Sequence, residues 1–227
     1  MTARALILTD IHLESPDCPA DIYLDIFEKY PCHEIILGGD IYDKSEAIGD
    51  KQWSVVEYLR KHKEGVAYVD GNHDPASDGV VNGMIGVKTR KEYRWKIGEK
   101  TFCVLHGHQF DRLGIFFSEP LVDKIITKIF TFLQKLDRHN RHVGKWLDYF
   151  HQRLALHIAR RAIRYAKKHG VDVIICGHIN RLDQLVVVDR KGKKTEYANC
   201  GGWDEKVVTF ITVTESGEVV LHCIPRK

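Results

Sequence analysis

The amino-acid sequence predicts an α/β fold in which short apolar strands alternate with amphipathic helices. The first apolar run covers residues 3–9, and its unbroken apolar pattern indicates a strand buried on both faces. Apolar residues at helical spacing over 19–30 and 51–62 predict helices between the strands. In α/β folds, ligands bind where the carboxyl ends of the strands meet, so the residues at which the strands end are the candidates for a functional site.

The stretch from Glu34 to Asp43 is central to this pattern. Residues 35–37 are apolar and predict a buried strand, and the two glycines after them allow a tight turn. Asp40 then places a carboxylate at the strand exit. We interpret Asp40 as a carboxylate shared between two metal ions.

The same arrangement recurs at four other strand exits, after residues 3–9, 66–69, 102–105 and 173–176. A single Asp-x-His or a single histidine on a strand is more often structural, but five strand exits that agree favour a site. The candidate metal ligands are Asp10, His12, Asp40, Asn72, His106, His178 and Asn180.

These candidates supply oxygen and imidazole nitrogen donors without thiolates. That donor set suits Mn²⁺, which we expect first, with Fe²⁺ and Zn²⁺ as alternatives. Two divalent ions that share a carboxylate can hold a phosphoryl group for in-line attack by a metal-bound hydroxide. The sequence therefore predicts a site with two divalent metal ions that acts on a phosphoryl group.

Length and composition indicate one cytoplasmic domain. The chain has 227 residues, 44% of them hydrophobic, with 34 basic and 31 acidic residues. Its six cysteines show no CxxC spacing, which favours a reducing compartment. The first apolar run ends too early for a signal peptide, and no run approaches the roughly 20 residues of a membrane span. We expect a single domain over residues 1–227.

A helical insertion is predicted at about residues 112–169, with one helix near 121–136 and a second near 146–162. Lysine and arginine outnumber acidic residues there. A basic helical cap could contact the inner face of a membrane peripherally, but basic residues could equally cover the outer faces of core helices. The rest of the chain predicts a hairpin at 93–97 and 101–105, then strands at 184–189, 195–199, 206–213 and 218–224.

The ordered motifs resemble those of the calcineurin-like metallophosphoesterase superfamily, over residues 6–180. They are Asp10-x-His12, Gly39-Asp40, Gly71-Asn-His-Asp74, His106-Gly-His108 and Gly177-His-x-Asn180. The resemblance implies a four-layer α/β/β/α double β-sandwich, here with the helical cap. It implies a first metal held by Asp10, His12, Asp40 and Asn180, and a second held by Asp40, Asn72, His106 and His178. His73 would act on the leaving group or the phosphoryl charge, oriented by Asp74.

A narrower resemblance is to the UDP-2,3-diacylglucosamine pyrophosphohydrolase group. It is carried by residues 106–111, the helical insertion, and Tyr197-Ala-Asn-Cys-Gly-Gly-Trp203. It implies cleavage of a lipid-linked or nucleotide-sugar pyrophosphate whose acyl chains the cap would hold. The chain departs from that group at His73, where arginine is usual, and at Gly202-Trp203, where many relatives have Gly-Asp-Trp.

Asn180 stands where the superfamily usually has a histidine ligand. A neutral amide oxygen can coordinate a metal, but it is a poorer donor than imidazole. His108 could compensate as a ligand, although we favour a role in the cleft, and we assign His108 and Arg181 to substrate binding.

Two other functions fit the same motifs. One is a phosphodiesterase or phosphomonoesterase that acts on a small soluble substrate. The other is a non-catalytic scaffold, which the nearly complete ligand set disfavours. Nucleic acid is a disfavoured partner, because no interleaving of aromatic and basic residues indicates a strand-binding groove.

Overall fold

The computed structural model describes residues 2–43, 47–74, 83–111 and 142–226, and for residues 142–151 it describes the backbone alone. Two β-sheets and three long helices make up this part of the chain. The predicted helix near 121–136 lies outside the described residues. Among the described helices, none is both long enough and apolar enough to cross a membrane.

The first sheet has six strands in the order β11-β10-β1-β2-β3-β4. Neighbours from β1 through β4 pair in parallel, while β10 pairs antiparallel with both β1 and β11. The strands are β1 (Ala3–Leu8), β2 (Cys32–Leu37), β3 (Val66–Val69), β4 (Thr89–Arg90), β10 (Val207–Val213) and β11 (Val219–Pro225).

The second sheet has five strands in the order β5-β6-β7-β9-β8. The expected hairpin is present as the antiparallel pair of β5 and β6, and β7 runs parallel to both β6 and β9. The strands are β5 (Tyr93–Ile97), β6 (Lys100–Val104), β7 (Val173–Cys176), β8 (Asp183–Val188) and β9 (Lys194–Asn199).

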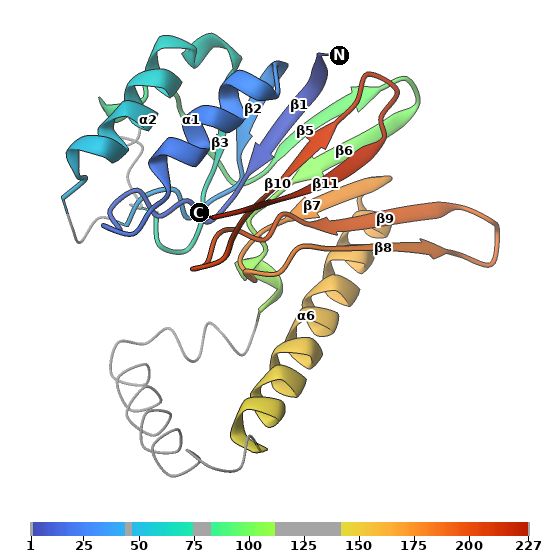
Figure 1. Cartoon of the computed structure of the whole chain (residues 1–227). Coiled ribbons are helices and arrows are strands. Elements are labelled where there is room, and N and C mark those ends of the chain that lie inside the picture. The colour runs from blue at the N-terminus through green and yellow to red at the C-terminus, as the bar shows by residue number, and fades with distance from the viewer. Residues whose placement is uncertain (1, 44–46, 75–82, 112–141, 227) are drawn as a thin grey trace.

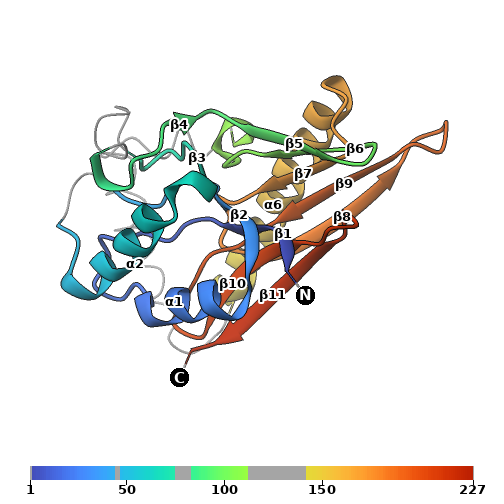
Figure 2. The same ribbon diagram turned by 90° about the horizontal axis from the view of Figure 1, so that it is seen from above.

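Helices cover the outer face of each sheet (Figure 1). Helices α1 (Ala20–Lys29) and α2 (Asp50–Lys61) lie together beside the first sheet, and α6 (His142–Lys168) runs along the second (Figure 2). Two 3₁₀ turns complete the described elements, η1 (Lys63–Gly65) and η2 (His108–Phe110). The predicted α/β class and the double-sandwich architecture are confirmed.

The alternation of side chains along β6 and β7 explains this layering. Phe102 and Val104 belong to the apolar cluster that includes the first sheet, whereas Cys103 and Leu105 belong to the cluster beneath α6. Successive residues of a strand face opposite sides, so each of these buried strands joins both layers of the core. The pattern in β7 is the same, with Val173 and Ile175 in the first cluster and Ile174 and Cys176 in the second.

Part of the predicted cap belongs to the core of the domain. Along α6, side chains from Ala155 to Ala166 are buried at helical spacing against the outer face of the second sheet. The apolar residues of this segment of the helix therefore complete the fourth layer of the sandwich. Its basic residues Arg160 and Arg164 are exposed, as the alternative interpretation of the basic segment expects.

Phe102 offers a test of the packing between the sheets. Its fully buried ring stacks on Trp95 at a centroid distance of 5.0 Å. We expect Phe102→Ala to lower the free energy of unfolding by about 3–5 kcal/mol, because it removes a large apolar side chain and leaves a cavity. Urea unfolding measures the loss, and Val188→Ala, which is 55% exposed, is the control with an expected change below about 0.5 kcal/mol. Equal effects in the two variants would contradict this account of the core.

Candidate metal centre

The five strand exits come from two sheets and meet in one place. Strands β1, β2 and β3 of the first sheet lead to Asp10, Asp40 and Asn72, while β6 and β7 of the second lead to His106 and His178. The ligand atoms of Asp10, His12 and Asp40 all lie within 4.8 Å of one another. Those of Asp40, His106 and His178 form a second such group, so Asp40 belongs to both.

Asn72 joins the second group through its side-chain oxygen. Asn72 Oδ1 and Asp40 Oδ2 each lie 3.1 Å from His106 Nε2. The other ring nitrogen, His106 Nδ1, lies 3.1 Å from the Gly38 carbonyl oxygen and can donate to it. That hydrogen bond leaves the Nε2 lone pair free to face a cation, which is the usual arrangement of a metal-binding histidine.

The backbone is strained at the residues of this centre. Among the described residues, four that are not glycine have a positive φ, and all four are predicted ligands: Asp10, His12, Asp40 and His178, with φ between 50° and 69°. L-residues rarely adopt this left-handed region, and such strain is found mainly where function requires a particular side-chain direction. The turn after each strand thus directs a donor group inward.

Glycine is required where the loops of the centre approach one another. A Cβ on Gly71 would lie 2.0 Å from Asp40 Oδ1, and one on Gly39, whose φ is +98°, would lie 2.6 Å from His106 Nδ1. Both distances are far shorter than van der Waals contact. The glycines of the motifs therefore make room for the donor side chains as well as turning the chain.

Two buried carboxylates make the centre favourable for positive charge. Burial raises the pKa of Asp10, and the charge of Asp40 raises it further against the opposing effect of His106. Burial alone would raise the pKa of Asp40, but its hydrogen bond to His106 and the charge of that imidazole hold it well below the usual range. The two carboxylates overcome the effect of burial on His106 and raise its pKa to about 9. A cation at this position would be stabilised in the same way.

His108 lies beside the centre without joining either group of donors. Its ring centroid is 5.4 Å from that of His106 and 6.4 Å from that of His178. Burial and the charges of these two imidazoles lower the pKa of His108 to about 4. Its Nδ1 is buried and has no hydrogen-bond partner among the described residues, so this nitrogen is available to a ligand.

Asn180 lies next to Asp10 and is exposed, as is its neighbour Arg181. A Cβ on Gly202 would lie 2.7 Å from Asn180 Oδ1 and 3.1 Å from the Asp10 Cβ, which places the amide oxygen on the side of the first donor group. The structure therefore brings Asn180 near the position that the resemblance assigns to it.

His73 is exposed and lies over the first donor group. Its ring centroid is 5.7 Å from that of His12, and its backbone N–H donates to Asp40 Oδ1 at 2.8 Å. The carboxylate in contact with its ring is Asp43, at 3.2 Å from Nδ1 to Oδ2. The expected orientation of His73 by Asp74 is therefore corrected, because Asp43 occupies that place.

Asp74 instead joins the loops that follow β2 and β3. Its buried carboxylate accepts hydrogen bonds from the backbone N–H groups of Asp40, Ile41, Tyr42 and Gly71 and from the hydroxyl of Tyr68, at 2.7–3.2 Å. A carboxylate offers about four lone-pair directions on two oxygens, so these five donors use its full accepting capacity. Asp74 thus fixes the loop that carries Asp40.

Two further carboxylates at the centre, those of Glu14 and Asp111, were missed from the sequence. Glu14 Oε1 lies 3.1 Å from His12 Nδ1, and Glu14 Oε2 accepts the Asp43 backbone N–H at 2.9 Å. Asp111 Oδ2 lies 3.1 Å from His178 Nε2. The positions of Glu14 and Asp111, close to metal-ligand motifs, were the only sequence signal, because histidine ligands are commonly held by a carboxylate.

A family model for calcineurin-like phosphoesterases matches residues 3–181. The chain belongs to this family. The match contains every predicted metal ligand, so the expectation drawn from the motifs is confirmed at the level of the family. The comparison with curated proteins gives no match.

Solved structures match the chain at low sequence identity. Vps29 from Chaetomium thermophilum is 14% identical with a TM-score of 0.51, over 98% of this chain and 97% of that one. The phosphoesterase Yfce from E. coli is 14% identical with a TM-score of 0.47, over 97% of each chain. A predicted phosphoesterase from Streptococcus pneumoniae is 14% identical with a TM-score of 0.41, over 100% of this chain and 99% of that one.

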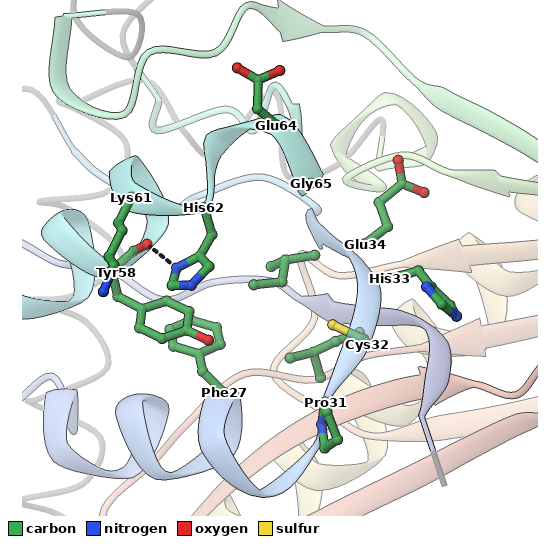
Figure 3. Close-up of a pocket in the computed structure, with 12 residues that line it drawn as sticks. Phe27, Pro31, Cys32, His33, Glu34, Tyr58, Lys61, His62, Glu64 and Gly65 are labelled. Atoms are coloured by element: carbon green, nitrogen blue, oxygen red, sulfur yellow. Dashed lines mark hydrogen bonds between the residues drawn. The ribbon is translucent and has the colours of Figure 1, made fainter.

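A separate cavity of about 410 Å³ opens at the other end of the first sheet, where β2 begins (Figure 3). Phe27 and Tyr58 stack there at 4.6 Å, and His62 continues the stack at 4.2 Å from Tyr58. None of the predicted metal ligands lines this cavity. It is therefore distinct from the metal centre.

Asp74 should be a main source of stability for the centre. We expect Asp74→Asn to lower the free energy of unfolding by about 2–4 kcal/mol, because the amide cannot accept all of these buried donors. Chemical denaturation gives the value. Asp204→Asn is the matched control, since Asp204 also accepts two backbone N–H groups but lies exposed in a turn, and its loss should be much smaller. A loss in Asp74→Asn no larger than in the control would refute this role.

Proposed function

We propose that the protein is a phosphoesterase or pyrophosphohydrolase that depends on two divalent metal ions. The observation that carries this proposal is the position of Asp40, whose carboxylate belongs to both groups of donor atoms. A shared carboxylate is the usual bridge of a two-metal site that acts on phosphoryl groups. The membership of the chain in the calcineurin-like phosphoesterase family supports the same chemistry.

The described residues suit this pair of ions. Asp10, His12, Asp40 and the amide oxygen of Asn180 would hold the first ion, and Asp40, Asn72, His106 and His178 would hold the second. The donors are oxygen and imidazole nitrogen, which Mn²⁺, Fe²⁺ and Zn²⁺ all accept, and we propose Mn²⁺ because the set is rich in oxygen. The orientation of His106 by the Gly38 carbonyl fits a metal ligand.

Bound ions of this kind would polarise the phosphoryl oxygens and lower the pKa of a water molecule. His73 lies at the exposed side of the centre and could donate a proton to the leaving-group oxygen. Asp43 contacts His73 Nδ1, so the opposite ring nitrogen is the one available for that transfer. Glu14 holds both His12 and the backbone of Asp43, and so positions the two sides of the site together.

The substrate we propose is a lipid-linked or nucleotide-sugar pyrophosphate such as UDP-2,3-diacylglucosamine. This assignment rests on the motif at residues 106–111 and on Tyr197 to Trp203. His108, with its unpartnered Nδ1, and Arg181 would contact the substrate. Hydrolysis of acylated and soluble phosphate esters by the same preparation distinguishes this substrate class from a small soluble one.

Removal of the shared carboxylate charge tests the two-metal assignment. We expect Asp40→Asn to lower the affinity for Mn²⁺ at both positions by at least about 100-fold, because both would lose a charged ligand. Elemental analysis and titration calorimetry measure the affinity, together with turnover of bis(p-nitrophenyl) phosphate. Asp21→Asn, an exposed change on α1, is the control. Two ions still bound tightly in Asp40→Asn would rule the assignment out.

His73 can be tested separately from metal binding. We expect His73→Ala to lower kcat by about 10²–10⁴-fold, the range typical of a general acid, while the metal content stays at the wild-type level. His62→Ala, an exposed histidine at the cavity of Figure 3, is the control. If His73→Ala keeps full turnover, or if it loses activity only through loss of metal, the proposed role is wrong.

A further inference from the structure

A shallow pocket of about 340 Å³ lies where α6 packs on η2. Phe110 of η2 and three residues from two successive turns of α6, Arg161, Arg164 and Tyr165, line it. The positions 161, 164 and 165 share one face of the helix, because residues three and four apart lie above one another. Two arginines and two aromatic rings thus face the same space.

The two arginines have no acidic partner in the part of the chain that the structure describes. Among the described residues, no carboxylate forms an ion pair with Arg161 or Arg164, although Arg94 nearby is paired with Glu92 at 2.8 Å. A guanidinium group presents several N–H donors in a plane that matches the oxygens of a phosphate. The pocket therefore holds two positive groups available to an anion.

The aromatic side of the pocket is fixed by hydrogen bonds. The Tyr165 hydroxyl donates to Glu92 Oε2 at 2.5 Å and accepts from Arg94 Nη2 at 3.2 Å. Its ring lies 5.7 Å from that of Phe110, which is buried. A wall held in this way needs little reorganisation when a ligand binds.

The pocket and the metal centre are connected by η2. This single turn carries His108 at its start and Phe110 at its end. The next residue, Asp111, contacts His178 Nε2 at 3.1 Å. One ligand could therefore place one group at the metal centre and another in the pocket.

We propose that Arg161 and Arg164 form a second anion subsite, which takes a phosphate group of the substrate while another phosphate lies at the metal centre. The aromatic walls would contact the carbon skeleton next to that phosphate. This inference rests on the proposed function for the identity of the reacting group. It narrows the substrate class to molecules with two phosphate groups, joined as a pyrophosphate or placed apart.

Binding to the full chain with the metal ions removed by a chelator tests the subsite alone. Calorimetry with inorganic pyrophosphate and with phenyl phosphate should show that Arg161→Gln and Arg164→Gln each weaken binding by roughly tenfold, because each loses a charge-assisted contact. Arg160→Gln is the matched control, since Arg160 is exposed on the same helix and does not line the pocket. Its affinity should stay within about twofold of wild type.

An equal loss in Arg160→Gln would mean general attraction of anions to a basic helix, and no loss in either pocket variant would mean that the pocket binds no phosphate. Either result overturns the subsite. Arginine-dependent binding in a protein that hydrolyses no phosphate ester with Mn²⁺ restored would keep the subsite and reject the proposed function. Hydrolysis of a phosphate ester without arginine-dependent binding would keep the proposed function and reject the subsite.

Discussion

The arrangement of the centre depends on one buried carboxylate, that of Asp40, held where the two sheets meet. The residue has a φ of +53°, and its side chain accepts the His73 backbone N–H and lies against His106. Neither the strained backbone nor the buried charge is favourable alone. Both persist because Asp74 holds the same loop through several hydrogen bonds and because Gly71 leaves room for the side chain.

The negative charge of the buried carboxylates explains why this strained arrangement would favour a bound cation. Asp10 and Asp40 are both buried, and two carboxylates near each other in a site of low polarity repel unless a cation lies between them. The raised pKa of His106 has the same cause, because the two carboxylates stabilise the positive charge of the protonated imidazole. The rigid double sandwich supplies the apolar core that stabilises the domain, so the loops at the strand exits can remain strained and directed at a shared point.

The sequence was sufficient to predict which residues meet but not how the strands divide between sheets. Apolar runs that end in glycine and a polar residue identify strand exits whatever sheet they belong to, and for this reason Asp10, Asp40 and His106 were found. The pairing of β7 with β9 rather than with β1 depends on contacts across the fold that periodicity does not encode. Asp74 is the sequence neighbour of His73, whereas Asp43 follows a different strand, and only the three-dimensional path of the backbone decides which carboxylate reaches the His73 ring.

Helix α6 shows how one element can serve both stability and recognition. Its buried face, with Ile158 and Ala162, completes the core of the second sheet, and packing against that sheet fixes the rotation of the helix about its axis. Once that rotation is set, Arg161 and Arg164 lie on one side of the helix, where they line a pocket with Phe110 of η2. A helix that is needed to close the core therefore also sets where a second charged group of a ligand can bind, and the geometry of recognition follows from the requirements of packing.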